Sequence, residues 1–277
     1  IGGGTAGLEA ACTAAEVGCN TFLLEKSNEL GGLASLISKI PAKNRLADFP
    51  HYLMHRAEQL DNLYIFKNTE GTPENIRKFH PNIIVSSTGS APLLPPIAGL
   101  KDRIDNENHN IYSILGMISH INDFPKDLEG KKVVVVGGGA VGLDVVEFFA
   151  DRNADISIVE MMDQIGRDLD PVSKNDTKAM MKKHNVHQLT KTALLEVKDS
   201  SFLVRGDGEP YELPFEYGFV CLGMRAQGQL YQNLTEEFSS EDVEIMNIGD
   251  SQRARRIIDG TQEGRNILTV LEQKGYL

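Results

Sequence analysis

The chain begins with IGGGTAGLEA (residues 1–10), in which Gly2, Gly4 and Gly7 form the pattern G-x-G-x-x-G. In α/β proteins this pattern marks the turn from a parallel strand into a helix, where backbone N–H groups face a bound pyrophosphate. Only Ile1 precedes the pattern, so the strand that should lead into the turn is not among the printed residues. The stretch predicts a dinucleotide-binding turn and leaves the position of its first strand open.

The same pattern recurs 135 residues later, where Gly137, Gly139 and Gly142 repeat the spacing. In each copy a glutamate, Glu25 or Glu160, follows the first glycine by 23 residues and ends an apolar run (TFLLE and ISIVE). Each copy also contains a helix-like segment between the glycines and that run. The sequence therefore predicts an α/β protein with two Rossmann-like dinucleotide-binding domains.

Each part of the repeated pattern has a physical reason. The first glycine permits the tight turn, the second lets the backbone approach the pyrophosphate, and the third lets helix and strand pack closely. The helix N-terminus offers unpaired N–H groups to the phosphates, and the glutamate can accept a hydrogen bond from a ribose hydroxyl. The alternative is a pair of glycine-rich turns in an α/β protein that binds no nucleotide.

The second copy also shows what the first one lacks. KKVVVV (131–136) precedes the second glycine turn and reads as a buried parallel strand. Residues equivalent to Lys131–Val135 would lie before Ile1. A parallel sheet without its central strand would expose unpaired backbone groups and apolar surface. We therefore expect this chain to be part of a longer one; without a starting Met, targeting cannot be judged.

Length and composition narrow the class of protein. A chain of 277 residues suggests about two domains. A net charge of −11 and the absence of a basic stripe argue against nucleic acid or an anionic membrane surface as partners. Three cysteines without a C-x-x-C motif do not make a disulfide framework and favour a reducing cytoplasm. The longest apolar stretch, residues 133–143, is too short to span a bilayer.

The remaining patterns predict a nested layout. Residues 1–115 and 226–277 would form the first domain, and residues 128–225 the second, inserted one. Further expected elements are a helix over 43–61 with Pro50 as its start or a kink, a strand at 63–66, and a strand followed by a turn over 82–92. They also include a helix over 171–184 capped by Asp170, several strands within 193–222, a strand ending at 249–250, and a C-terminal amphipathic helix whose apolar residues are Ile257, Ile258, Ile267, Leu268 and Leu271.

Several stretches together resemble a known family. With the two glycine motifs, STG (87–89), GMR (223–225) and GD (249–250) resemble flavoproteins with two dinucleotide domains, including the pyridine-nucleotide disulfide reductases. More specifically, the chain resembles the C-terminal half of 2-enoate reductases, 2,4-dienoyl-CoA reductases and trimethylamine dehydrogenase. The stretches that carry this resemblance are LLEKSNELGGLASL (23–36), IPAK (40–43), VVVVGGGAVGLDVVEFFA (133–150), VEMMDQIGRDLD (159–170) and GDSQRARRIIDGTQEG (249–264).

The resemblance implies one cofactor on each motif. FAD would contact Gly2, Gly4, Thr5, Ala6, Gly7, Glu25, Lys26, Gly31, Gly32, Thr88, Gly89, Gly249 and Asp250. NAD(P)H would contact Gly137, Gly139, Ala140, Val141, Gly142, Glu160 and Gly223. The family also implies a preceding (βα)8 barrel with FMN, the substrate site and an iron–sulfur cluster. This chain contains neither that barrel nor its cysteine run, so the final acceptor is not assigned.

The resemblance also implies a reaction. Glu25 would hold the adenosine ribose of FAD, and Asp250 its ribityl or pyrophosphate side, with a simple turn residue as the alternative for Asp250. Glu160 would accept from a 2′-hydroxyl and repel a 2′-phosphate, which favours NADH over NADPH. A hydride would pass from NADH to FAD without a side chain acting as acid or base, so no catalytic residue is named. Without a dithiol, electrons must leave by another route.

Other features have plainer interpretations. His51 and His55 are spaced i, i+4 but lack an obvious third ligand, so no metal site is expected. Cys12 and Cys19 read as packing residues, and Arg253, Arg255 and Arg256 as either cofactor contacts or a solvated cluster.

The alternative function is a nucleotide-binding scaffold, as in trimethylamine dehydrogenase, where ADP replaces FAD. A homo-oligomer is left open.

Overall fold

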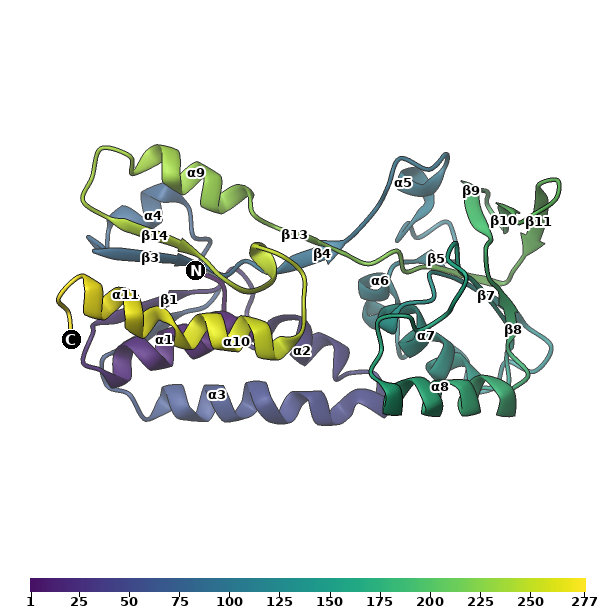
Figure 1. Cartoon of the computed structure of the whole chain (residues 1–277), viewed down its shortest axis with the longest axis horizontal. Helices are drawn as coiled ribbons and strands as arrows, with labels where there is room; N and C mark the ends of the chain where they lie inside the picture. The colour runs from purple at the N-terminus through teal and green to yellow at the C-terminus, as the bar shows by residue number, and fades with distance from the viewer. The chain divides into compact units, whose positions relative to one another are not determined.

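The computed structural model describes residues 1–277, which divide into two compact units (Figure 1). Unit 1 contains Ile1–Lys39, Lys43–Ala91 and Met224–Leu277, and unit 2 contains Ile40–Ala42 and Pro92–Gly223. The second unit is thus inserted in the first along the chain.

Residues 92–115 belong to unit 2, whereas the sequence assigned them to the first domain. The reason is strand pairing, because β5 (Ile111–Tyr112) adds to unit 2 beside β12 (Tyr217–Val220) in parallel. β5 has only two residues, which is too short for a strand to be recognised from its sequence.

Unit 1 has two separate parallel strand pairs. One pair is β1 (Thr21–Leu24) with β2 (Leu63–Phe66), and the other is β3 (Ile83–Ser86) with β14 (Glu244–Asn247). Ile1 and Gly2 lie between the pairs. The Ile1 amine donates to the Val85 carbonyl at 2.7 Å, and the Gly2 N–H donates to the Leu24 carbonyl at 2.8 Å. Ile1 and Gly2 therefore occupy the position where a central strand of this sheet would end.

Helices cover both faces of these strands. Figure 1 shows α1, α10 and α11 on one side of β3 and β14, and α4 and α9 on the other. The helical segments of unit 1 are α1 (Thr5–Glu16), α2 (Gly32–Ile37), α3 (Asp48–Glu58), α4 (Pro73–Arg77), α9 (Gln229–Glu237), α10 (Ile257–Arg265), α11 (Ile267–Gln273) and the 3₁₀ turn η2 (Gly249–Ser251). The 3₁₀ segment η1 (Pro41–Ala47) spans the boundary between the units, and the short β4 (Ser90–Pro92) pairs with β13 (Met224–Ala226).

Two predicted helices differ in detail. The expected helix over 43–61 is divided into η1 and α3, and Pro50 is the third residue of α3, where a helix needs no N–H donor. The expected C-terminal helix is interrupted at Asn266.

The burial of the C-terminal residues also differs from the sequence prediction. Ile267 and Leu271 are buried as expected, but Ile257 and Ile258 are 39% and 58% exposed. The face of α10 that meets α1 is formed by Gly260 and Gly264 instead, because only glycine permits so close an approach; a Cβ on Gly264 would lie 2.6 Å from the Ala6 carbonyl oxygen.

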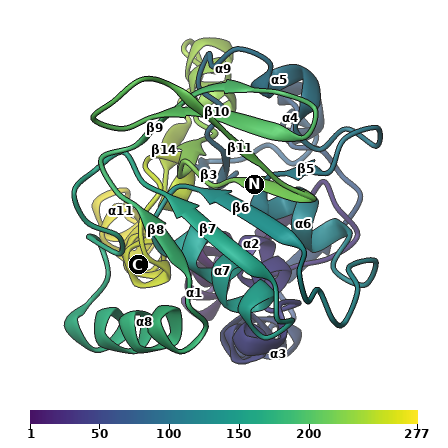
Figure 2. The same cartoon turned by 90° about the vertical axis from the view of Figure 1, so that its right-hand side faces the viewer.

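Unit 2 is built on a fully parallel five-stranded sheet in the order β5-β12-β6-β7-β8. Figure 2 shows α7 and α6 on one face and the antiparallel sheet β11-β10-β9 on the other. Its remaining elements are α5 (Leu100–Arg103), α6 (Ile114–Ser119), β6 (Lys132–Val136), α7 (Ala140–Ala150), β7 (Asp155–Val159), α8 (Pro171–Lys183), β8 (His187–Leu189), β9 (Ala193–Val197), β10 (Ser201–Arg205) and β11 (Tyr211–Pro214). The Asp170 cap of α8 is confirmed, since its carboxylate accepts from the Val172 N–H at 2.9 Å.

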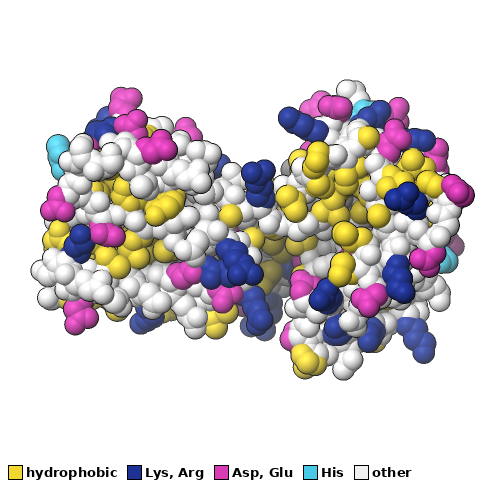
Figure 3. Space-filling model, turned by 45° about the horizontal axis from the view of Figure 1, so that its top comes forward, with side chains coloured by type: hydrophobic (Ala, Val, Ile, Leu, Met, Phe, Trp, Pro, Cys, Tyr) yellow, Lys and Arg dark blue, Asp and Glu magenta, His cyan; other side chains and the backbone are white.

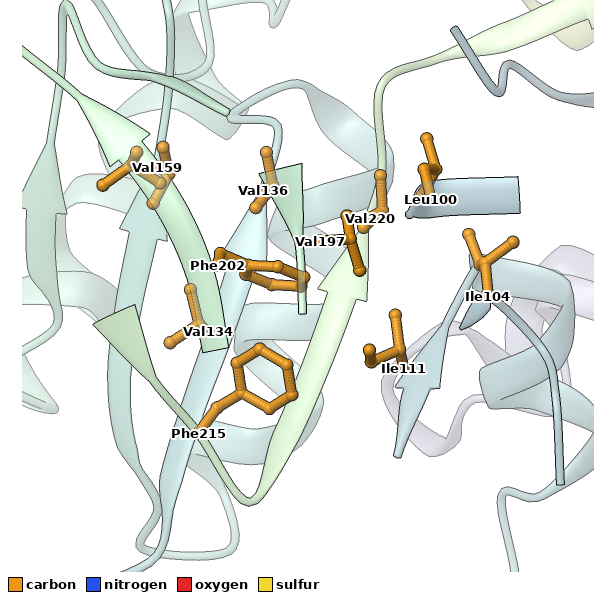
Figure 4. Close-up of a cluster of buried hydrophobic side chains, with 11 residues drawn as sticks. Leu100, Ile104, Ile111, Val134, Val136, Val159, Val197, Phe202, Phe215 and Val220 are labelled. Atoms are coloured by element: carbon orange, nitrogen blue, oxygen red, sulfur yellow. The ribbon is translucent and has the colours of Figure 1, made fainter. Parts of the chain in front are cut away.

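The core of unit 2 lies between its two sheets. Figure 4 shows the rings of Phe202 and Phe215 pointing toward Val134 and Val136 of β6. The two rings contact each other with centroids 4.5 Å apart. Burial of side chains from both sheets fixes the carboxyl end of β6, and therefore the glycine turn that follows it.

Surface features agree with the charge pattern of the sequence. On the face drawn in Figure 3, acidic and basic side chains are interspersed on each unit. None of the helices combines the length and the apolar character that crossing a bilayer requires.

A buried ion pair links α1 to α3 in unit 1. Arg56 Nη1 lies 2.9 Å from Glu9 Oε1, and their side chains are only 12% and 6% exposed. Arg56 also pairs with Glu16 and thereby lowers the pKa of the Glu16 carboxyl. A charge this deeply buried costs free energy unless its partner is present.

We expect Arg56→Ala to lower the free energy of unfolding by about 3–5 kcal/mol, because Glu9 would be left buried without its main partner. Chemical denaturation measures this change. The matched control is Arg45→Ala, because the Arg45 side chain is 90% exposed and pairs only with exposed Asp48, so its effect should stay within about 0.5 kcal/mol. Equal effects of the two substitutions would contradict the prediction.

Candidate functional site

The first glycine corner is built by backbone contacts that exclude side chains. Gly2 has φ +98° and a Cβ there would lie 2.4 Å from the Ser87 carbonyl oxygen. A Cβ on Gly7 would lie 1.9 Å from the Gly2 carbonyl oxygen. These contacts hold the start of α1 directly against Gly2, and Gly2 against Ser87 at the end of β3.

Gly4 has the opposite environment. It is the N-cap of α1 and no protein atom lies within 4 Å of the position of its missing Cβ. No side chain caps the helix and no acidic residue stands in its first turn. The first N–H groups of α1, those of Thr5, Ala6 and Gly7, precede the first intrahelical bond, from Leu8 N–H to the Gly4 carbonyl. An open position at a helix start, where N–H groups have no intrahelical acceptor, fits a phosphate.

Glu25 joins the end of β1 to this loop. Its Oε2 accepts from the Gly3 N–H at 2.7 Å, and its Oε1 accepts from the Ser27 N–H at 2.8 Å. Lys26 is exposed beside it. The carboxylate is therefore oriented toward the glycine loop by two backbone donors.

Gly31 and Gly32 cross the same corner from the other side. Both have positive φ, at +96° and +57°, and the Gly31 N–H donates to the Gly3 carbonyl at 2.7 Å. A Cβ on Gly32 would lie 3.0 Å from the Gly4 Cα. Glycines here let the chain pass close against the loop.

A second group of predicted residues lies at the ends of β3 and β14. Thr88 donates to the Gln227 carbonyl at 2.7 Å, and Gly89 has φ +73° with open space at its Cβ position. Asp250 accepts from the Ser90 hydroxyl and from the Arg255 N–H, each at 3.0 Å.

Glu263 is a residue of this region that the sequence analysis missed. Its carboxylate accepts from the Gly249 N–H at 2.7 Å and pairs with Arg255. It therefore fixes the turn that carries Asp250. Its spacing of 14 residues from Gly249, across a turn and a helix, gave no signal in the sequence.

Unit 2 repeats the corner of unit 1. Gly137 has φ +109°, and a Cβ on Gly142 would lie 1.9 Å from the Gly137 carbonyl oxygen. Gly139 is the uncapped N-cap of α7, and both carboxylate oxygens of Asp168 lie 3.9 Å from its Cβ position. Ala140 and Val141 form the first turn of α7. The glycine corner is therefore present twice, with an acidic side chain near the second one.

The acidic residue repeats as well. Glu160 Oε2 accepts from the Gly138 N–H at 2.7 Å, as Glu25 does from Gly3. Its Oε1 accepts from the Met162 N–H at 2.7 Å. Gly223, three residues after the end of β12, has φ +100° and open space at its Cβ position. All predicted residues of the second set thus lie in unit 2.

The comparisons with known proteins agree with this geometry. The family described as pyridine nucleotide-disulphide oxidoreductase matches residues 1–245. The chain belongs to this family. The fold of the chain is accordingly the pyridine nucleotide-disulphide oxidoreductase fold, with two Rossmann-like domains. Members of this family bind FAD and NAD(P)H.

Individual relatives of the family cover nearly the whole chain. An NADH oxidase of Thermoanaerobacter brockii is 27% identical over 265 residues, 95% of this chain and 39% of its own. A metal reductase of Desulforamulus reducens is 28% identical over 302 residues, 96% of this chain and 42% of its own. The solved structure of a 2-naphthoyl-CoA reductase complex has a TM-score of 0.81 at 24% identity, covering 96% of this chain and 38% of that one. The chain spans about two fifths of the length of these relatives.

The chain has no paired thiols. Cys12, Cys19 and Cys221 are all free, and Cys12 and Cys221 are buried. Burial raises the pKa of the Cys12 thiol to about 11 and that of Cys221 to about 12. Neither thiol is suited to thiol–disulfide exchange, which needs an accessible thiolate.

The histidine pair lies on the surface of α3. His51 and His55 are both exposed, and His55 lies 3.6 Å from Glu58. No group of three or more His, Cys, Asp or Glu side chains in the chain could hold a metal ion.

We expect Gly4→Ala and Gly7→Ala to separate binding from folding. The methyl group of Gly4→Ala enters open space, so it should weaken FAD binding by about tenfold or more while stability changes little. Gly7→Ala forces a backbone shift and should cost about 1–3 kcal/mol. Thermal melting and flavin retention measure the two effects, and an unaffected flavin content in Gly4→Ala would contradict the assignment.

Thiol reactivity should follow burial. At pH 8 only about one in a thousand Cys12 thiols is ionised, since its pKa is about 11. The half-buried Cys19 should therefore react first with iodoacetamide, and Cys221 should react only after unfolding. Mass spectrometry of timed samples measures this order, and early labelling of Cys221 would disprove it.

Proposed function

We propose that this chain is the electron-input half of a larger flavoprotein, in which NADH bound to unit 2 reduces FAD bound to unit 1. The observation that carries the proposal is the duplicated glycine corner with a carboxylate held at the same place in each copy. A scaffold needs only one nucleotide site. Two complete cradles are what a chain needs if it brings two dinucleotides together.

In this proposal each site residue contacts one of the two cofactors. FAD would lie against Gly2, Gly4, Thr5, Ala6, Gly7, Glu25, Lys26, Gly31, Gly32, Thr88, Gly89, Gly249 and Asp250. NADH would lie against Gly137, Gly139, Ala140, Val141, Gly142, Glu160 and Gly223. The open position at Gly4 and the uncapped start of α7 at Gly139 support the phosphate placement in the two units.

The chain would contribute binding and orientation, while FAD supplies the ring that accepts and passes on electrons. Helix α1 would direct its N–H groups at the pyrophosphate of one cofactor, and α7 at that of the other. Glu25 and Glu160 would each accept from a ribose hydroxyl. We assign no side chain a proton-transfer role.

The preference for NADH rests on the surroundings of Glu160. Its negative charge would repel a 2′-phosphate and accept from a 2′-hydroxyl. The two residues that follow, Met161 and Met162, are exposed and carry no charge that could hold a phosphate. The next residue, Asp163, is acidic.

The larger protein is proposed from the length of the relatives. The chain covers 39% of the NADH oxidase and 42% of the metal reductase. We propose that the remainder includes an N-terminal barrel of the enoate-reductase type, carrying FMN and an iron–sulfur cluster that take electrons onward from FAD. The absence of paired thiols in this chain supports a route of that kind.

Two measurements on the purified protein test the function. Mass spectrometry of the released nucleotide should find FAD, and anaerobic addition of NADH should bleach the visible flavin absorbance. Release of ADP in place of FAD, or flavin that NADH does not reduce, would favour the scaffold alternative.

We expect Glu160→Gln to weaken NADH binding by about tenfold or more, because a hydrogen bond to a charged acceptor contributes about 1.5–3 kcal/mol. The amide oxygen can still accept from the Gly138 N–H, so the glycine loop should be retained, while the Met162 N–H loses its acceptor. Calorimetric titration measures the affinity. The matched control is Asp163→Asn, which removes an exposed charge three residues away and should change it little. Tighter binding of NADPH than NADH to the unaltered chain would refute the preference.

A further inference from the structure

The loop between β7 and α8 brings a carboxylate to the glycine corner of unit 2. Asp168 belongs to this loop, and both of its carboxylate oxygens lie 3.9 Å from the position that a Cβ on Gly139 would occupy. The corner of unit 1 differs, because no protein atom lies within 4 Å of the same position at Gly4. The two corners therefore share their glycines but differ in the charge that faces the start of the helix.

Backbone contacts at both ends of the loop fix the place of Asp168. Gly166 has φ +65° and donates its N–H to the Gly138 carbonyl at 2.7 Å. The Leu169 N–H donates to the Gly166 carbonyl at 3.2 Å, which closes a turn around Asp168. Asp170 ends the loop as the N-cap of α8. The loop therefore cannot carry Asp168 away from the corner without breaking these bonds.

The Asp168 carboxylate has no partner of its own in the protein. The residue is exposed, and its carboxylate forms neither a hydrogen bond nor a salt bridge. Arg167, the preceding residue, is also exposed and forms no salt bridge with Asp168. No neighbouring cation therefore holds the carboxylate away from the start of the helix.

The group that the carboxylate faces is the N-terminus of α7. This helix has neither a side-chain cap nor an acidic residue in its first turn. Its first intrahelical bond runs from the Leu143 N–H to the Gly139 carbonyl, so the helical N–H groups before Leu143 have no intrahelical acceptor. An anion is stabilised at such a helix start. Asp168 and a bound phosphate would therefore interact with the same partial positive charge and repel one another.

The acidic residue is particular to the second copy of the glycine pattern. The offset of 135 residues between the copies pairs Asp168 with Leu33, and Arg167 with Gly32. Gly32 brings bare backbone to the first corner, since a Cβ on it would lie 3.0 Å from the Gly4 Cα. Unit 1 thus presents backbone and an apolar residue where unit 2 presents two charged residues.

We propose that Asp168 is an internal competitor for the phosphate position of unit 2, and that it makes the nucleotide of this unit exchangeable. This inference rests on the proposed binding of one dinucleotide to each unit. The carboxylate would weaken the binding of a pyrophosphate at the start of α7 and speed its release. Unit 1 has no such group at Gly4 and would retain its nucleotide.

This difference matches what the two nucleotides of the proposed reaction must do. A protein that oxidises NADH has to release NAD⁺ and bind a new NADH in every cycle, whereas FAD stays in place as the resident cofactor. Tight binding at unit 2 would therefore slow the cycle, and tight binding at unit 1 would not.

The test measures nucleotide binding to Asp168→Asn, which keeps the shape of the side chain and removes its charge. NADH should bind about tenfold more tightly than to the unaltered chain, and its displacement in a stopped-flow experiment should slow to a similar extent. Adenosine, which lacks phosphates, should bind both forms equally. The matched control is Asp163→Asn, because Asp163 is exposed in the same loop but is not within 4 Å of the Gly139 Cβ position.

Ionic strength gives a readout that a merely structural role of Asp168 would not move. The ratio of the two NADH affinities should be largest at low salt and should approach one near 1 M NaCl, where the screening length is about 3 Å. The melting temperature of the nucleotide-free protein should not rise in Asp168→Asn, because the carboxylate faces the positive end of α7. The flavin content of unit 1 should be unchanged.

The possible outcomes separate this proposal from the proposed function. Equal NADH affinities of Asp168→Asn and the unaltered chain would overturn the proposal and leave the proposed function intact, as would equally tighter binding of adenosine. Weaker NADH binding by Asp168→Asn would also overturn it, since the carboxylate would then hold the nucleotide, directly or through a divalent cation. Failure of every form to bind NADH would overturn both.

Discussion

The close approach of Gly7 to the Gly2 carbonyl is the constraint on which the architecture of unit 1 depends. With no room for a methyl group between them, α1 begins against the strand end and points its first N–H groups outward. The contact recurs between Gly142 and Gly137. The remaining features of the corner, namely the open Gly4 cradle and the carboxylate of Glu25 on Gly3, follow from the placement of that helix start.

The carboxylates act on the loop as well as on any ligand. Glu25 and Glu160 each bond a loop N–H with one oxygen and a local backbone N–H with the other. Both are therefore oriented by the protein itself, which reduces the ordering that ligand binding requires. The likeness between the two units therefore extends to the whole corner and not only to the glycines.

Much of this was predictable because it depends on local patterns. The glycine spacing, the carboxylate at the strand end, strand β2 and the Asp170 cap all follow from residues close in sequence. The contacts that escaped prediction join distant residues. Glu263 reaches Gly249 across a turn and a helix, and β5 is recognised only through its pairing with β12. The buried face of α10 was predicted wrongly because it is made of Gly260 and Gly264, which carry no hydrophobic signal.

The order of the units along the chain has a consequence for biosynthesis. Unit 2 is almost contiguous, so nearly all of its residues have left the ribosome once Gly223 emerges. Unit 1 needs both ends of the chain, because α1 packs backbone against backbone on α10 near the C-terminus. During synthesis the residues of unit 1 that precede unit 2 must therefore wait, with the face of α1 that meets α10 uncovered, until α10 has been made. Apolar surface that stays uncovered in this interval makes a nascent chain prone to aggregation.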